Sequence, residues 1–247
     1  YIKVGEQNVV AVRVDNSKQR NCRWYTGAGI YRHVWLVTTE ALHVAHWGTY
    51  ITTPEVTKEL AKVLVAVQVK NETEADKKAV VSVSLQRKGV EVAKGSVHVS
   101  IASLKENKAI IALDVKNPEL WSPDTPSLYE ALVTVEAGGQ VMDSVTEAFG
   151  IRTFTYSATD GFRLNGQPML LNGGCAHHDN GVLGAKSFDA AEARKVRLMK
   201  EAGFNAVRTS HNLPSEAFLH ECDRQGLLVI DESFDGWRDS KTPFDYS

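Results

Sequence analysis

The chain has 247 residues, of which 43% are hydrophobic and 23% charged, a composition typical of soluble globular proteins and sufficient for one large or two ordinary domains. Its formal net charge of −2 argues against a dedicated nucleic-acid-binding protein. No apolar run approaches the roughly 18 residues of a membrane-spanning helix, and the absence of a recognisable targeting segment leaves the compartment open.

Residues 1–43 are predicted to be β structure. The valines of residues 8–14 (NVVAVRV) alternate as in a strand, and residues 31–37 (YRHVWLV) predict another. A loop rich in glycine and aromatic residues, 21–29, separates them. Because two strands do not form a stable domain alone, we expect this segment to be the end of a larger domain.

Residues 44–152 predict an immunoglobulin-like β-sandwich. Apolar side chains recur at every second position in several runs separated by polar turns, at residues 63–69, 81–85, 97–101, 111–115 and 129–135. About seven short strands in about 100 residues are typical of this fold. The Cys…Trp…Cys spacing of antibody domains is absent. The three cysteines lie far apart, without metal-ligand spacing, and are expected to be buried free thiols: Cys22, Cys175 and Cys222.

Residues 153–247 change to an α/β pattern. Asn165-Gly166 between two apolar runs predicts a hairpin. A helix is predicted over about 190–202, with Asp189 and Glu192 as a capping box and Gly203 after its end. A strand at 204–208, a helix at about 215–225 and a strand at 227–231 follow. This order indicates parallel strands with right-handed crossovers, in too small a number to close an eight-stranded barrel.

Polar side chains follow each of the three predicted parallel strands, where the loops of α/β barrels build active sites. They are His177, His178 and Asp179 after the first, Arg208, Ser210 and His211 after the second, and Asp231, Glu232 and Asp235 after the third. A set of this kind is hard to explain by stability alone, so we expect a ligand site there.

Each of these residues also has a structural interpretation. His177 and His178 are adjacent on extended backbone, so only one of them faces the site. Arg208 could be an ion-pair partner of Asp231 or Glu232, and His211 could cap the second helix. Asp231 and Glu232 are adjacent, so one of them is expected to orient Arg208 without touching the ligand itself.

Metal binding and ring stacking are two further functions for which the sequence offers candidate residues. The spacing of His177 and His178 differs from the His-x-His of barrel metallohydrolases, so no metal is predicted. A set made of His178, His211 and Asp231 is the remaining alternative. Trp24 and Trp237 are candidates for stacking on a ligand ring, although loop anchoring explains Trp24 equally well and packing explains Trp237 equally well.

Several motifs, in order along the whole chain, resemble glycoside hydrolase family 2, the β-galactosidase type. Residues 23–32 (RWYTGAGIYR) resemble the end of its sugar-binding jelly-roll domain. Residues 120–123 (LWSP) and 126–129 (PSLY) resemble its sandwich, and residues 149–152 (FGIR) resemble its link to the barrel. The first three strands of its TIM (β/α)8 barrel are resembled by residues 165–168 (NGQP), 178–179 (HD), 205–211 (NAVRTSH) and 223–232.

The resemblance implies three parts: residues 1–43 from the jelly-roll domain, 44–152 as the sandwich and 153–247 as the start of the catalytic barrel. It implies a retaining glycosidase acting on terminal β-linked sugars, most often galactose. The family's two catalytic glutamates follow the fourth and seventh barrel strands, so the chain is expected to end before both. By position, His178, Asp179, Arg208 and His211 match residues of the sugar subsite, and His178 is the histidine expected to face it.

Two departures weaken the choice of substrate. Arg23 stands where bacterial β-galactosidases place an aspartate, and Gly236 stands in place of one of their magnesium ligands. We therefore expect no metal and no cofactor, and β-glucuronidase or β-mannosidase activity stays open. A non-catalytic carbohydrate-binding or scaffold module is the alternative from another class, disfavoured by the α/β part. The expected partner is a carbohydrate, in a bacterial parent protein of periplasmic or cytoplasmic location, with a homo-oligomeric state left open.

Overall fold

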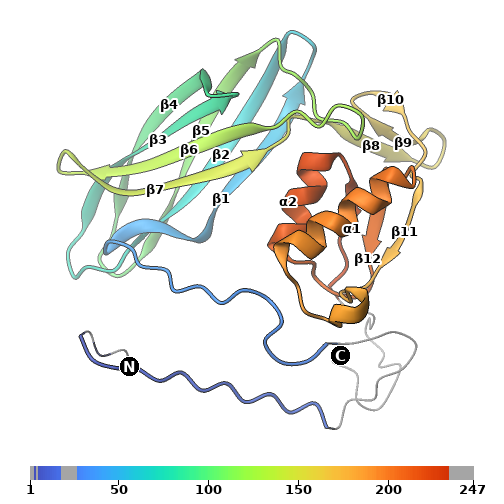
Figure 1. Cartoon of the computed structure of the whole chain (residues 1–247). Coiled ribbons are helices and arrows are strands. Elements are labelled where there is room, and N and C mark those ends of the chain that lie inside the picture. The colour runs from blue at the N-terminus through green and yellow to red at the C-terminus, as the bar shows by residue number, and fades with distance from the viewer. Residues whose placement is uncertain (1–2, 4, 18–26, 234–247) are drawn as a thin grey trace. The chain divides into compact units, whose positions relative to one another are not determined.

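The computed structural model describes residue 3, residues 5–17 and residues 27–233. Its contacts divide the chain into two compact units (Figure 1). One unit comprises residues 35–172 together with 222–228. The other comprises the described residues up to 34, residues 173–221 and the described residues from 229 onwards. Among the described residues, no helix has the length and apolar character needed to cross a bilayer.

Residues 42–149 form two antiparallel sheets, as the immunoglobulin-like sandwich requires. The smaller sheet has the order β1-β2-β5 and the larger the order β4-β3-β6-β7. The strands are β1 (Leu42–Val56), β2 (Leu60–Asn71), β3 (Lys77–Arg87), β4 (Val90–Ile101), β5 (Glu106–Lys116), β6 (Tyr129–Ala137) and β7 (Gln140–Phe149). The sandwich fold predicted from the alternation is confirmed.

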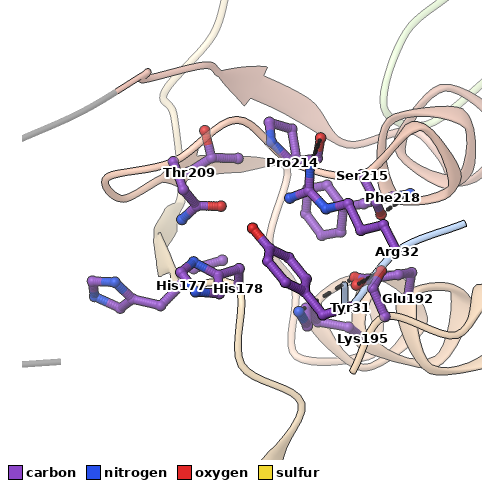
Figure 2. A pocket seen from close by; sticks show the side chains of 13 residues that line it. Tyr31, Arg32, His177, His178, Glu192, Lys195, Thr209, Pro214, Ser215 and Phe218 are labelled. Atoms are coloured by element: carbon purple, nitrogen blue, oxygen red, sulfur yellow. Dashed lines mark hydrogen bonds and ion pairs between the residues drawn. The ribbon is translucent and has the colours of Figure 1, made fainter. Parts of the chain in front are cut away.

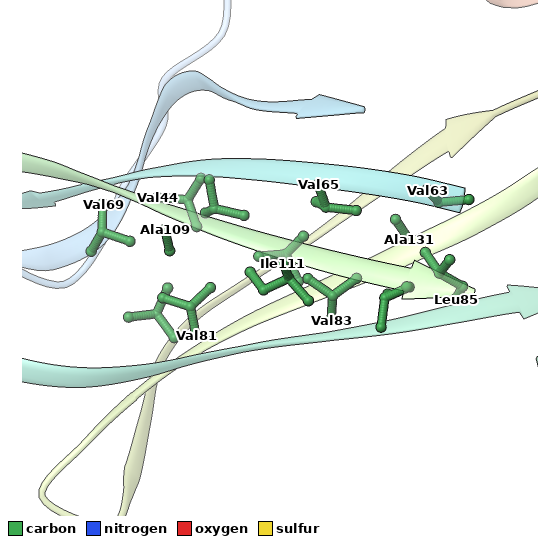
Figure 3. Packing of buried hydrophobic residues seen from close by; sticks show 14 of the residues in the cluster. Val44, Val63, Val65, Val69, Val81, Val83, Leu85, Ala109, Ile111 and Ala131 are labelled. Atoms are coloured by element: carbon green, nitrogen blue, oxygen red, sulfur yellow. The ribbon is translucent and has the colours of Figure 1, made fainter. Parts of the chain in front are cut away.

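The sandwich core consists of the residues at every second position that the sequence pattern indicated. Val63, Val65, Val67 and Val69 of β2 have no exposed surface. Figure 3 shows side chains of β2 and β5 facing those of β3 and β6 across the space between the sheets. Because successive side chains of a strand point to opposite faces, this alternation buries one face of each sheet and leaves the other polar.

Trp121, in the segment between β5 and β6, is the largest fully buried side chain, 1% exposed. Its backbone N–H donates to the Ile151 carbonyl at 2.8 Å, and its own carbonyl accepts from Asn165 Nδ2 at 3.0 Å. The indole Nε1 donates to the Asp223 carbonyl at 2.7 Å, and the Arg152 guanidinium lies 4.7 Å from the ring centroid. Trp121 therefore connects segments of the first unit that are far apart in the sequence.

A small antiparallel sheet follows the sandwich, formed by β8 (Phe154–Ser157), β9 (Gly161–Leu164) and β10 (Gln167–Pro168). Asn165 and Gly166 connect β9 to β10 with φ values of 50° and 76°. Positive φ at both central residues defines the type I′ turn, which Asn-Gly favours. The predicted hairpin is confirmed.

The α/β part contains a three-stranded sheet of order β11-β12-β13, with β11 and β12 parallel. Its elements are β11 (Gly173–Ala176), the 3-10 helix η1 (Gly181–Leu183), α1 (Asp189–Glu201), β12 (Ala206–Thr209), α2 (Glu216–Gln225) and β13 (Leu228–Ile230). This succession is the beginning of a TIM barrel, as predicted. Gly203, with a φ of 84°, follows α1 as expected of a C′ glycine.

Three local expectations were wrong. No strand forms over residues 8–14 or 31–37, where Val9 and Leu36 are each 84% exposed. A strand needs a neighbour for its backbone groups, and the alternating pattern does not supply one. Asp189 is the first residue of α1 rather than its cap, which is Phe188. Cys175 is exposed, whereas Cys222 is buried as expected and Cys22 lies outside the described residues.

Candidate functional site

Glu232, two residues after β13, is the centre of a cluster of charged side chains. Its Oε2 lies 2.6 Å from Arg208 Nη2, and its Oε1 lies 2.9 Å from His211 Nδ1. Arg208 lies in β12, and His211 lies two residues beyond the end of that strand. The three residues that follow or end neighbouring strands thus meet, as their sequence positions predicted.

The hydroxyl group of Thr209 also forms hydrogen bonds that position the two carboxylate residues after β13. Thr209 Oγ1 donates to Asp231 Oδ1 at 3.1 Å and accepts the backbone N–H of Glu232 at the same distance. Thr209 is 2% exposed, and both hydrogen bonds are partly buried. Asp231 is thereby directed to Thr209, and Glu232 is the carboxylate that reaches Arg208. The order of the two adjacent carboxylates follows from their opposite directions on extended backbone.

Arg208 also contacts β11. Cys175 and Arg208 are register partners, and Arg208 Nη1 lies 3.5 Å from Cys175 Sγ. This hydrogen bond, together with the charge of Glu232, raises the pKa of Arg208 above its already high value. The guanidinium therefore stays charged at any pH of interest and is held by a thiol on one side and a carboxylate on the other.

The two adjacent histidines lie on different sides, as their adjacency requires. The His177 ring meets the His211 ring edge to face, with centroids 5.8 Å apart. The His178 ring instead stacks on Tyr31 at 5.7 Å, and its Nε2 accepts the Gly27 backbone N–H at 2.7 Å. His177 is therefore the histidine beside the Glu232 cluster, and the neutral His178 carries its proton on Nδ1.

The register of β11 against β12 explains this arrangement of the two histidines. In an extended segment, residues two apart share a face. Cys175 faces Arg208, so His177 lies on the same side, whereas His178 is directed away. Asp179 is exposed and lines a separate apolar hollow with Val182, Leu198 and other residues.

Burial lowers the pKa of His178, and the positive charge of Arg32 lowers it further. Both residues line a small cavity together with Tyr31, Lys195, Pro214 and Phe218 (Figure 2). The cavity has a volume of about 20 Å³, far below the roughly 300–1,000 Å³ of small-molecule sites. This cavity is a small packing gap that is too small for a sugar ring.

A buried carboxylate also lines this cavity. Glu192, in the first turn of α1, is 4% exposed. It accepts hydrogen bonds from Ser187 Oγ at 2.8 Å and Asn180 Nδ2 at 3.2 Å, and it pairs with Lys195 Nζ at 3.3 Å. These contacts fix the connection from β11 to α1. The capping-box pattern in the sequence predicts a different role for Glu192.

Several predicted residues are not brought into the cluster or lie outside the description. His178, His211 and Asp231, weighed as a metal set, bond to three different groups: Gly27, Glu232 and Thr209. Ser215 rather than His211 caps α2, since its Oγ accepts the Phe218 N–H at 3.1 Å. Trp24 and Trp237, proposed for sugar stacking, lie outside the described residues, as do Arg23, Asp235 and Gly236.

The sandwich and the barrel start, with charged side chains gathered after parallel strands, define the class of a multidomain TIM-barrel protein. Two family models match the chain: glycosyl hydrolases family 2 over residues 43–152, and the TIM barrel domain of the same family over residues 158–236. The chain belongs to glycosyl hydrolase family 2.

Relatives with different named activities resemble this chain. A β-galactosidase of Bacteroides ovatus is 45% identical over the whole chain, which covers 29% of that protein. A β-glucuronidase of Bacteroides fragilis is 30% identical over 92% of the chain and 34% of its own length. The chain spans less than a third of the length of the first curated relatives it matches.

Solved structures agree in fold. A family 2 glycosyl hydrolase of Bacteroides cellulosilyticus superposes with a TM-score of 0.86 at 46% identity, covering 89% of this chain and 30% of that one. A β-glucuronidase of Bacteroides uniformis gives a TM-score of 0.83 at 29% identity, covering 93% and 29%. The fold predicted from the sequence is confirmed by these neighbours.

Proposed function

We propose that the whole protein to which this chain belongs is a retaining glycoside hydrolase that releases terminal β-linked sugars, with β-galactosides as its first substrates. The observation that carries this proposal is the Arg208–Glu232–His211 cluster, which follows neighbouring strands of a family 2 barrel. The 45% identical β-galactosidase supports the choice of galactose.

The chemistry of the cluster suits hydroxyl recognition. A guanidinium offers five donors in a fixed fork, and imidazole donates or accepts according to its tautomer. Glu232 has both carboxylate oxygens engaged by Arg208 and His211, which is the arrangement of a residue that orients ligand contacts. We assign Arg208 and His211 to sugar hydroxyls, and Glu232 and Asp231 to holding them. His178 and Asp179 stay predictions from the motif resemblance.

Bond cleavage in this class needs two carboxyl groups about 5–5.5 Å apart, one as acid/base and one as nucleophile. By family resemblance these follow the fourth and seventh barrel strands. The 247 residues supply the strands β11, β12 and β13 of the barrel. We therefore expect this chain by itself to bind sugar weakly at most and not to hydrolyse it.

The test compares the 247-residue chain with the whole protein on aryl β-galactosides. Turnover is expected from the whole protein and not from the chain. Turnover by the chain that survives purification and disappears with Glu232→Gln would mean that the catalytic residues are misplaced. No turnover by the whole protein on any aryl β-glycoside would favour the alternative of a non-catalytic carbohydrate-binding module.

A β-glucuronidase is the second candidate, supported by the relatives of that activity at 30% and 29% identity. A glucuronide carries a carboxylate, for which a charged guanidinium such as that of Arg208 is a suitable partner. Parallel assays with aryl β-glucuronide and aryl β-galactoside distinguish the two, since the ratio of kcat/KM values measures specificity directly.

A further inference from the structure

We propose that Arg32 is a positioning residue for His211, acting through the loop between β12 and α2. Residues 27–33, here called the N-terminal strap, bring Arg32 to that loop. The kinetic consequences rest on the proposed hydrolase function. The structural claim does not, because it concerns contacts within one compact unit of this chain.

The N-terminal strap is fixed along its length to the connection between β11 and α1. The Gly27 N–H donates to His178 Nε2 at 2.7 Å, and the Tyr31 carbonyl accepts the Ser187 N–H at 2.9 Å. His33 Nε2 lies 2.7 Å from Asp189 Oδ1 at the start of α1. Arg32 thus projects from a segment that is held on both sides.

The guanidinium of Arg32 donates hydrogen bonds to two consecutive backbone carbonyls. Nη2 donates to the Leu213 carbonyl at 2.5 Å and Nη1 to the Pro214 carbonyl at 3.2 Å. Figure 2 shows Arg32 close to Pro214 and Ser215, with Tyr31 nearby; its guanidinium lies 5.3 Å from the Tyr31 ring centroid. A planar fork that engages two acceptors fixes both position and orientation, which the single ammonium of lysine does not.

Stabilisation of α2 does not explain this contact. A cation at the beginning of a helix is opposed by the helix dipole, and α2 already has Ser215 as its cap. The loop before α2, in contrast, is fixed directly by the two hydrogen bonds from Arg32. Residues 210–215 join Thr209, the end of β12, to Glu216, the start of α2. His211 lies two residues before the first gripped carbonyl and bonds Glu232 at 2.9 Å. Because only Asn212 separates them, a displaced Leu213 would change the position of His211 relative to Glu232.

The first experiment is a double-mutant cycle in the whole protein. Arg32→Lys keeps the charge and removes the fork. We expect it to lower kcat/KM by about 10-fold in the native background and by less than about 2-fold in the His211→Ala background, because its effect passes through His211. Arg197→Lys is the matched control, because it makes the same substitution in an exposed ion pair with Glu201 within α1, and it should leave kcat/KM nearly unchanged. Equal losses from Arg32→Lys in both backgrounds, or a lower Tm with native kinetics, would overturn the proposal.

The second experiment uses the 247-residue chain and needs no activity. Amide hydrogen exchange at His211, Asn212 and Leu213 should become faster in Arg32→Lys, whereas exchange within α1 should stay native. Arg197→Lys, the control from the first experiment, should leave the three loop amides unchanged. Native exchange of the loop in Arg32→Lys would refute the positioning role. Absence of turnover in the unmodified whole protein would refute the proposed function alone, and the exchange result would still decide the role of Arg32.

Discussion

Arg208 has a side chain that is 43% exposed, and this exposure decides how its loss should appear. A pair exposed to this degree contributes little to folding. Its hydrogen bonds to a substrate hydroxyl would matter more if they strengthen as the sugar ring flattens toward the transition state.

In the whole protein we therefore expect Arg208→Ala to lower kcat/KM by about 10-fold or more, mainly through kcat, since each 1.4 kcal/mol corresponds to tenfold. Activity and Tm should be measured on one preparation. Normal kinetics with a lower Tm would reduce Arg208 to the structural ion pair that was the alternative interpretation of the sequence.

His178 should give the chain a pH-dependent stability. Burial, aided by the positive charge of Arg32, lowers its pKa below the ordinary value of 6.5. The folded state therefore binds fewer protons than the unfolded state, so stability is full above pH 6.5 and falls as the pH decreases toward the lowered pKa. Protonation of Nε2 would also remove the acceptor of the Gly27 N–H.

The variant His178→Gln tests this expectation, because an amide oxygen replaces Nε2 as acceptor and does not titrate. Asp179, His177 and Lys195 also act on His178 and stay in place in the variant. Between pH 7.5 and 5 the native chain should lose more thermal stability than the variant. Parallel stability curves for the two proteins would show that His178 does not control the acid response.

At the scale of elements, β11 and β12 approach too closely for a side chain at one position. A Cβ added to Gly173 would lie 1.9 Å from the Ala206 carbonyl oxygen, which is backbone and cannot rotate away. A Cβ on the adjacent Gly174 would meet nothing closer than 3.6 Å, the edge of the Phe204 ring. Adjacent glycines thus offer a matched pair of substitutions.

We expect Gly173→Ala to destabilise the α/β part by roughly 1–3 kcal/mol or more, as overpacking against rigid atoms does, and Gly174→Ala to change it by less than about 1 kcal/mol. Chemical denaturation followed by circular dichroism measures both. Equal stability of the two variants would mean that β11 and β12 do not pair as described.

At the scale of the whole molecule, the sandwich contains its own core and should fold without the rest. A polypeptide of residues 42–152 contains all of β1 to β7 and should melt cooperatively; a disordered NMR spectrum would contradict this. The environment of Trp121 differs between this polypeptide and the full chain. In the full chain its Nε1 donates to the Asp223 carbonyl, which the polypeptide does not contain.

Trp121→Phe removes that donor while keeping an aromatic ring. In the full chain it should cost about 0.5–1.5 kcal/mol for the lost hydrogen bond. In the polypeptide of residues 42–152, where residue 223 is missing, the hydrogen-bond contribution should vanish. Equal costs in both proteins would mean that ring packing alone accounts for Trp121.

Local patterns in the sequence determined much of this protein. Alternating valines in β2, the Asn-Gly turn before β10 and the glycine after α1 each specify backbone geometry through nearest neighbours, and all appear as predicted. The gathering of Arg208, His211 and Glu232 also followed from sequence, because the ends of adjacent parallel strands meet at one edge.

Only the tertiary structure decided which groups touch. The choice between His177 and His178 depends on the register of β11 against β12, and the grip of Arg32 on the Leu213 carbonyl joins residues 181 positions apart. The alternating residues 8–14 show the converse, since their pattern alone does not make a strand. Periodicity records which face a residue occupies, whereas a contact depends on the packing of segments that the local sequence does not specify.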